Sequence, residues 1–120
     1  MSTVSTGRLA YLASPYTHTD KAVEAQRYEA VLAAWIWLIQ HNRDLHFFVP
    51  IVQSHPLCVK GFPVEWKFWA DFDGTMISRC QELWVLAIPG FVESTGVNAE
   101  IKIATDLGLP VKYLVPKNDG

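Results

Sequence analysis

The sequence is poor in residues that form metal sites and disulfide frameworks. Cys58 and Cys80 are its two cysteines, and their separation fits neither a zinc motif nor a network of disulfides. The four histidines form no zinc-binding pattern with them. We therefore expect two free thiols, with Cys80 buried, and no bound metal or other cofactor.

The chain also lacks a long apolar run and a large excess of charge. Residues 30–40 are mostly apolar, but polar residues 41–44 end the run well before the roughly 20 residues that a membrane helix needs. A formal net charge of −2 leaves no basic surface for a nucleic acid polymer. Residues 1–8 are polar, without the apolar region of a signal peptide. These absences predict a cytoplasmic protein that binds neither membrane nor nucleic acid polymer.

Hydrophobic residues are plentiful and regularly arranged. They make up 50% of the 120 residues, enough for the core of one domain spanning residues 1–120. Apolar runs with strand character alternate with segments of helical periodicity. This alternation predicts a doubly wound, flavodoxin- or Rossmann-like parallel α/β sheet of about four to five strands flanked by helices. We expect strands at residues 9–13, 46–50, 83–88 and 111–115, and helices after Asp20 and at residues 64–79 and 95–107.

One strand, loop and helix near the carboxyl end form the most informative unit. The apolar run at residues 82–88 ends at Pro89-Gly90, and helical spacing of apolar residues resumes at residue 95 and stops at Gly108. A loop at the carboxyl end of a strand opens into the crevice where open α/β sheets bind ligands. We therefore expect a ligand site at this edge.

The start of that helix carries groups that suit an anion. Ser94 or Thr95 can cap the helix, and free N–H groups there attract an anion such as a phosphate. Glu100 lies about one turn inside the helix. Its carboxylate either takes part in chemistry or only complements the helix dipole.

The loop after the first strand brings further polar groups to the same edge. Ser14, Tyr16 and His18 lie in it, and Arg27 follows on the next helix. His18 and Arg27 are placed to approach a phosphate or a ribose, and the guanidinium fork binds oxygens bidentately. A solvated arginine on an exposed helix face is the alternative.

Residues 51–63 carry few packing signals and predict a long loop between the second strand and the next helix. Long connections in small α/β domains are often functional. His55 stands in this segment and is a candidate to cover a substrate base. A turn histidine without a role fits the pattern equally well.

Five tryptophans in a small chain invite a base-stacking interpretation. Trp35 and Trp37 lie two residues apart on a helix and face different directions, so we expect one on the sheet and the other at a subunit contact. Trp66 and Trp69 share a predicted helix face with Asp73. They either wall a base pocket or pack in a core or an interface.

Three motifs together resemble the nucleoside 2-deoxyribosyltransferase superfamily: Tyr11-Leu-Ala-Ser-Pro-Tyr-Thr-His18, Ser94-Thr-Gly-Val-Asn-Ala-Glu100 and Gly108-Leu-Pro-Val111. They are most similar to a small bacterial and phage branch, and the second motif also resembles the 2′-deoxynucleoside 5′-monophosphate N-glycosidases. Members form dimers or larger assemblies in which a neighbouring subunit completes the site. The resemblance therefore implies a homodimer or higher homo-oligomer.

The resemblance also implies catalytic roles. Glu100 matches the nucleophile that attacks C1′ of the sugar as the N-glycosidic bond breaks. Tyr11 matches the tyrosine that orients this glutamate, with a core aromatic as the alternative. Asp73 falls where the family has an acid/base toward the leaving base, and Asp71 fits if the register shifts.

The same resemblance implies substrate contacts. Ser94 and Gly96 match positions that hold a 5′-phosphate in the nucleotide-cleaving branch, although a simple helix cap predicts the same serine. The substrate-binding candidates are Ser14, Tyr16, His18, Arg27, His55, Ser94 and Gly96.

These patterns lead to one preferred function. We expect an N-glycosidase or 2-deoxyribosyltransferase that cleaves or transfers the N-glycosidic bond of a (deoxy)nucleoside or its 5′-monophosphate. The first alternative is a non-catalytic nucleotide-binding or sensing module of the same fold. The second is a purely structural partner protein.

Overall fold

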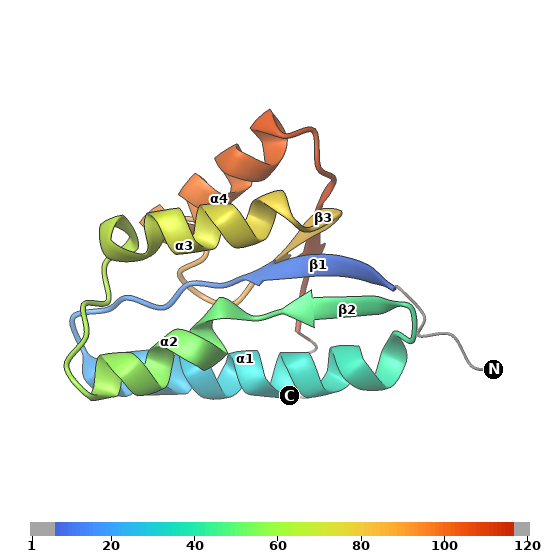
Figure 1. Cartoon of the computed structure of the whole chain (residues 1–120). Helices are drawn as coiled ribbons and strands as arrows, with labels where there is room; N and C mark the ends of the chain where they lie inside the picture. Colours follow the sequence, from blue (N-terminus) through green and yellow to red (C-terminus); the bar gives the residue numbers. More distant parts are fainter. Residues whose placement is uncertain (1–6, 117–120) are drawn as a thin grey trace.

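Strands and helices alternate along the chain as the periodicity predicts, except that two helices in place of one lie between the second and third strands (Figure 1). The computed structural model describes residues 7–116, so most of the polar start at residues 1–8 lies outside the described residues. The elements are, in order, β1 (Arg8–Ala13), α1 (Lys21–His41), β2 (Leu45–Phe48), α2 (Pro50–Val59), α3 (Trp66–Ser78), β3 (Glu82–Leu86), α4 (Thr95–Asp106) and β4 (Val111–Leu114).

The strands form one parallel sheet in the order β2-β1-β3-β4. Tyr11 on β1 pairs with Phe48 on β2 and with Leu83 on β3, and Leu83 pairs in turn with Val111 on β4. The chain leaves β1 toward β2 and then returns past it to β3, which puts the topological switch point between β1 and β3. This arrangement confirms the doubly wound, flavodoxin- or Rossmann-like fold.

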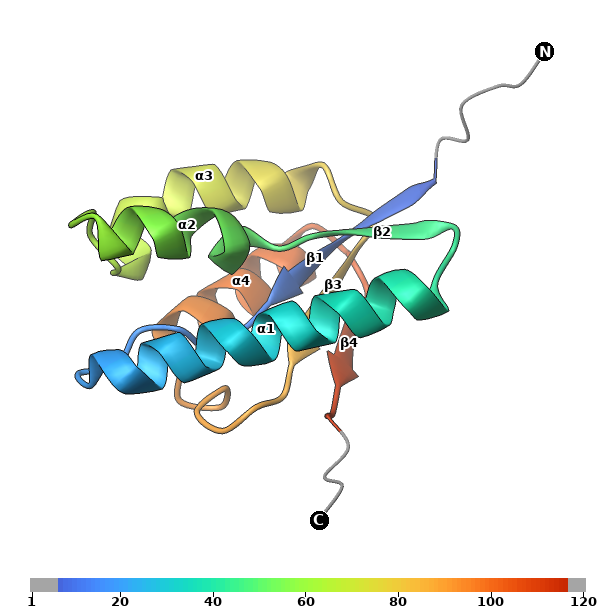
Figure 2. The ribbon, with the colours of Figure 1, turned by 90° about the horizontal axis from the view of Figure 1, so that it is seen from below.

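Helices cover both faces of the sheet, and a separate hydrophobic core lies between the sheet and the helices on each face (Figures 1 and 2). Because successive side chains of a strand point to opposite faces, Leu83 and Val85 pack with α3 and α4 whereas Leu86 packs with α1. Ile51 and Val52, at the start of α2, pack against the α1 side. No helix within residues 7–116 combines the length and apolarity needed to cross a bilayer.

The expected helix caps are present. Asp20 Oδ1 accepts a hydrogen bond from Ala22 N at 2.9 Å at the start of α1, and Ser94 Oγ accepts one from Val97 N at 3.2 Å at the start of α4. Gly108 has a φ of 75° just after α4, a conformation that glycine adopts without a Cβ penalty. The helix that carries Glu100 is thus fixed at both ends.

The expectation of a long loop at residues 51–63 is wrong, because α2 occupies Pro50–Val59. Pro50 is the first helical residue, where its fixed φ and missing N–H do no harm. Gly61 ends the helix with a φ of 104°, and it donates to Cys58 O while Phe62 N donates to Leu57 O. This is the Schellman hydrogen-bond pattern, which satisfies the last carbonyls of a helix.

A buried carboxylate joins the amino ends of three strands. Glu82 on β3 is fully buried and contacts Arg8 on β1 and Lys112 on β4, the latter at 3.1 Å. Its Oε1 also accepts a hydrogen bond from Trp84 Nε1 at 2.6 Å. Burial alone would raise the pKa of Glu82, but the hydrogen bonds from Trp84 and Lys112 and the charges of Lys112 and Arg8 outweigh it and lower that pKa.

Candidate active site

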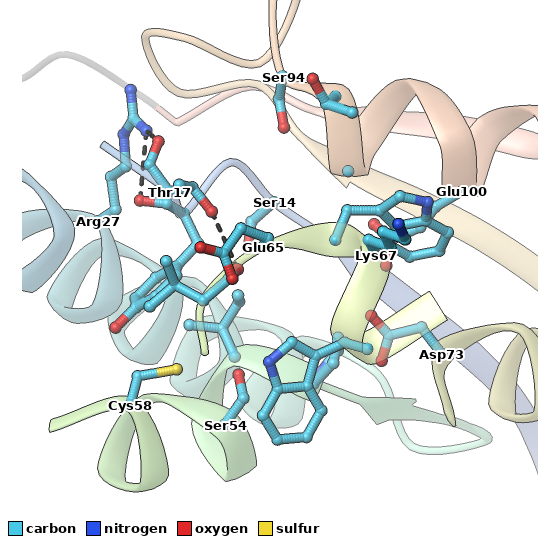
Figure 3. A pocket seen from close by; sticks show the side chains of 18 of the residues that line it. Ser14, Thr17, Arg27, Ser54, Cys58, Glu65, Lys67, Asp73, Ser94 and Glu100 are labelled. Carbon is cyan, nitrogen blue, oxygen red and sulfur yellow. Dashed lines mark hydrogen bonds between the residues drawn. The ribbon is translucent and has the colours of Figure 1, made fainter. Parts of the chain in front are cut away.

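A cavity of about 670 Å³ lies at the carboxyl ends of β1 and β3, next to the switch point (Figure 3). Its volume is in the range of small-molecule sites. The loops after β1 and β3 contribute to its wall, as do α2, α3 and the first turns of α4. Of the residues predicted for the site, the cavity is lined by Ser14, Tyr16, Arg27, Asp73, Ser94, Gly96 and Glu100.

Glu100 occupies a position that helical periodicity reserves for the core. Val97 and Ala104 lie three residues before and four after it on α4, and both are fully buried against the sheet. Glu100 is buried between them, with 5% of its surface exposed. Tyr11, fully buried on β1, donates its hydroxyl hydrogen to Glu100 Oε2. A strand and a helix far apart in sequence thus position this carboxylate.

Asp73 takes the corresponding position on α3. It lies four residues before the fully buried Ile77 and is itself 8% exposed, facing the cavity (Figure 3). Asp71, two residues earlier, is exposed and does not line the cavity. The geometry therefore brings Asp73, and not Asp71, to the side of Glu100.

Burial raises the pKa values of this cluster. Desolvation raises the pKa of Asp73 from 3.8 to about 6, against the effect of hydrogen bonding to Glu100 and Tyr11. Burial and then the charge of Asp73 raise the pKa of Glu100 well above its ordinary value. Burial and then the charge of Glu100 do the same for Tyr11, which remains a hydrogen-bond donor. Both carboxyls therefore bind a proton more tightly than free carboxyls do, and the charge of Asp73 opposes ionisation of Glu100.

The first turn of α4 borders the same cavity, as does Ser14 just after β1. The first intrahelical hydrogen bond of α4 runs from Asn98 N to Ser94 O, so the N–H groups of Thr95 and Gly96 precede it and point out of the helix end. Ser14 Oγ is buried without a hydrogen-bond partner within residues 7–116. Because buried hydroxyl groups are normally paired, this atom is available to a ligand.

Arg27 joins two loops at the mouth of the cavity. Its Nη1 donates to Tyr16 O at 3.3 Å and to Thr17 O at 2.9 Å (Figure 3). Its Nη2 lies against the Cα of Gly90, where a Cβ would collide with it. Arg27 lines the cavity, and its Nη1 is already hydrogen-bonded to the loop after β1.

The two histidine candidates do not line the cavity. His18 Nδ1 accepts a hydrogen bond from Asp20 N at 2.9 Å, next to the start of α1. His55 lies on α2, stacked on Tyr28 with ring centroids 4.1 Å apart and hydrogen-bonded through Nδ1 to the Tyr16 hydroxyl. His55 therefore contacts Tyr16 from α2, outside the cavity lining. It does not lie on a loop that could cover a ligand.

A family model described as "Domain of unknown function (DUF1937)" matches residues 8–115, nearly the whole described chain. The chain belongs to this family. None of the curated proteins matches it. The matched range includes every residue of the cavity described above.

Aromatic rings form one wall of the cavity in this DUF1937 domain. Trp66, Trp69 and Phe72, all on α3, line it. The indole Nε1 of Trp69 donates to Pro63 O at 2.8 Å, and its ring meets Phe72 edge to face with centroids 6.2 Å apart. The wall is thus held by its own contacts and presents apolar faces to a ligand.

Sequence reasoning missed the α2 side of the site. Pro50, Ile51, Gln53, Ser54 and Cys58 line the cavity from this helix. Pro50 and Gly61 carried the signal, because proline at a helix start and glycine just after a helix end delimit a helix.

The two cysteines of the DUF1937 domain are free, and Cys80 is buried as predicted. Within residues 7–116, no three His, Cys, Asp or Glu side chains are arranged to hold a metal ion.

Proposed function

We propose that the chain cleaves or transfers the N-glycosidic bond of a nucleoside or its 5′-monophosphate, with Glu100 as nucleophile. The observation that carries the proposal is the carboxyl pair Glu100 and Asp73 on the cavity floor, with Tyr11 donating to Glu100. Double displacement needs one carboxyl protonated as the acid and the other ionised as the nucleophile, and burial raises the pKa of Asp73 toward the protonated form that the acid requires. The resemblance of the Ser94 to Glu100 motif to the nucleoside 2-deoxyribosyltransferase superfamily supports the same chemistry.

The proposed reaction has two balanced steps. In the first, Glu100 Oε1 bonds to C1′ while the C1′–N bond breaks, and protonated Asp73 gives its proton to the leaving base. In the second, the Asp73 carboxylate takes a proton from water as the water oxygen bonds to C1′ and the ester to Glu100 breaks. A second base in place of water would make the same cycle a transfer. Tyr11, acting on Oε2, keeps the carboxylate oriented.

The cavity offers a complementary region to each part of such a substrate. The sugar would lie over Glu100, with its 5′ end toward the N–H groups of Thr95 and Gly96 and the unpartnered Ser14 Oγ. The base would lie against the aromatic wall of α3, because flat rings stack favourably on aromatic side chains. Polar donors at one end and apolar rings at the other suit a nucleoside or nucleotide better than a uniformly polar metabolite.

The test is a chromatographic assay of free base released from a panel of nucleosides and 5′-monophosphates, with and without an acceptor base. Wild type should release base from at least one member, and Glu100→Ala should not. Asp71→Asn is the matched control for Asp73→Asn, because both lie on α3 but only Asp73 faces the cavity. Release by Glu100→Ala at the wild-type rate would overturn the proposal. Nucleotide-induced stabilisation without turnover by wild type would instead favour the sensing module.

A further inference from the structure

Glu24 on α1 is a buried carboxylate that the proposed reaction does not use. It lies at seven-residue spacing from Val31 and Leu38, which are both fully buried, so it occupies a position of the buried stripe of that helix. Only 3% of Glu24 is exposed. A buried carboxylate costs free energy unless hydrogen bonds and charges offset it, whereas an apolar side chain would pack here without that cost. Packing alone therefore does not explain this residue.

The contacts of Glu24 attach the loop after β1 to α1. Its Oε2 accepts a hydrogen bond from His18 N at 2.9 Å, and its Oε1 accepts one from Lys21 Nζ at 3.1 Å. The side chain of Lys21 is 76% exposed, which limits the strength of this ion pair. The hydrogen bond to the loop is therefore the contact that distinguishes Glu24 from an apolar residue.

Arg27, one turn further along α1, contacts the same loop. Its Nη1 donates to Tyr16 O and to Thr17 O (Figure 3). Within the described chain, no backbone group of residues 15–19 is hydrogen-bonded to another backbone group. Side chains therefore determine the shape of this loop, and we call Glu24 and Arg27 the loop clamp.

The loop clamp acts on residues that form the cavity wall. Ser14, Tyr16 and Thr17 line the cavity, and Ser14 Oγ is buried without a hydrogen-bond partner within residues 7–116. Pro15, between Ser14 and Tyr16, is fully buried, and its ring fixes the backbone φ angle. A shift of Tyr16 or Thr17 is therefore passed on to Ser14.

We propose that Glu24 and Arg27 are positioning residues, which hold the Ser14 hydroxyl in place to bind the sugar end of the substrate. This inference rests on the proposed function, in which Ser14 Oγ contacts the 5′ end of a nucleoside or nucleotide. Glu24 does not line the cavity, and Arg27 acts through the two loop carbonyls. Because the loop is shaped before the substrate arrives, binding does not have to order it.

Amide hydrogen exchange in the ligand-free chain tests the clamp without any activity. The exchange rate of the His18 amide should rise at least about 10-fold in Glu24→Ala, because a hydrogen bond to a charged acceptor is lost. Glu24→Gln keeps an acceptor oxygen and should exchange near the wild-type rate. Glu29→Ala is the control, since Glu29 is an exposed glutamate on the same helix. Unchanged exchange in Glu24→Ala would overturn the proposal.

Steady-state base release tests whether the clamp acts through Ser14. Ser14→Ala and Arg27→Gln should each raise KM about 10-fold and change kcat less than about 3-fold, because the lost contact is made in ground state and transition state alike. The double variant should show no further rise, because no hydroxyl is left to position. Additive effects would mean that Arg27 contacts the substrate itself, which would overturn the proposal. Arg43→Gln, at an exposed arginine after α1, is the control.

Binding measurements separate failure of the clamp from failure of the proposed function. If wild type releases no base, calorimetric dissociation constants of the four 2′-deoxynucleoside 5′-monophosphates replace KM, with the same ratios expected. Near-ultraviolet circular dichroism confirms that each variant is folded. If Glu24→Ala does not fold, Arg27→Gln should itself raise the exchange rate of the His18 amide about 10-fold. Wild type that binds none of these nucleotides, or Arg27→Gln that binds them as tightly as wild type, would overturn the proposal.

Discussion

Replacing Asp73 with asparagine should change the dependence of stability on pH. Asp73 is 8% exposed, and desolvation raises its pKa from 3.8 to about 6. A carboxyl with a raised pKa in the folded state binds its proton more tightly there than in the unfolded chain. The stability it contributes is therefore fully present below about pH 4 and is lost as the pH rises through about 6.

The size of this effect follows from the shift. About two pKa units at 1.36 kcal/mol per unit correspond to about 3 kcal/mol. Asparagine carries no charge at any of these pH values and avoids this loss. Removing the charge of Asp73 also lowers the pKa of Glu100, because that charge is one of the causes that raise it. Both effects raise the free energy of unfolding of Asp73→Asn relative to wild type at neutral pH.

Urea unfolding followed by tryptophan fluorescence at pH values from about 4 to about 8 measures this difference. The free energy of unfolding of Asp73→Asn should gain on that of wild type by about 2–3 kcal/mol as the pH rises through about 6. Asp71→Asn, on the exposed side of α3, should run parallel to wild type. A difference between Asp73→Asn and wild type that does not change with pH would show that Asp73 does not titrate with a raised pKa in the folded protein.

Three further substitutions test particular contacts. Gly90→Ala should lower the free energy of unfolding by about 1–3 kcal/mol in urea titrations, because φ is 98° and a Cβ would displace Arg27 Nη2 and disturb the hydrogen bonds of this guanidinium to Tyr16 O and Thr17 O. Tyr11→Phe removes the donor to Glu100, which should slow base release roughly 10- to 100-fold in steady-state assays and move the acidic limit of activity to higher pH. Glu82→Gln should cost about 2 kcal/mol near neutral pH and less in acid, measured by urea unfolding, because stability from its lowered pKa is lost as pH falls.

Matched controls isolate each cause. Gly61 has a φ of 104°, but a Cβ added there would have no neighbour within 4 Å. Gly61→Ala should therefore show backbone strain without displacing another side chain. Tyr113→Phe alters an exposed tyrosine and should leave turnover unchanged. Asp106→Asn breaks an exposed ion pair with Lys102 and should cost far less than Glu82→Gln. Equal effects of test and control in any pair would contradict the corresponding argument.

The sequence allowed the sheet to be predicted because strand and helix periodicities differ clearly in this chain. The boundaries of α4 were predictable for the same reason, since Ser94 caps the helix and Gly108 ends it. The helix within residues 50–59 could not be predicted in the same way. The two prolines within residues 50–56 and the lack of a long apolar stripe obscured this helix of ten residues. Pro50 and Gly61 mark the ends of this helix, and the packing of Ile51 and Val52 against the sheet core adds a tertiary contact that the sequence does not display.

Some positions in the candidate site could likewise be predicted from the sequence, and others could not. Glu100 and Asp73 each stand where helical periodicity calls for an apolar residue, so their burial could be anticipated from sequence. The position of His55 could not, because it depends on ring stacking with Tyr28, 27 residues earlier in the chain. The unpartnered Ser14 hydroxyl likewise becomes evident only once the loop after β1 is placed beside α4.

The most direct test of the central claim is to look for sugar bound to Glu100. The chain is mixed with the nucleoside or nucleotide that it cleaves fastest, quenched with acid during turnover, digested and examined by mass spectrometry. If Glu100 is the nucleophile, one glycosyl group should be attached through an ester on the peptide that contains Glu100, and none in Glu100→Ala, which should also release no base. Undiminished base release by Glu100→Ala, with the Glu100 peptide of wild type unmodified throughout turnover, would contradict it.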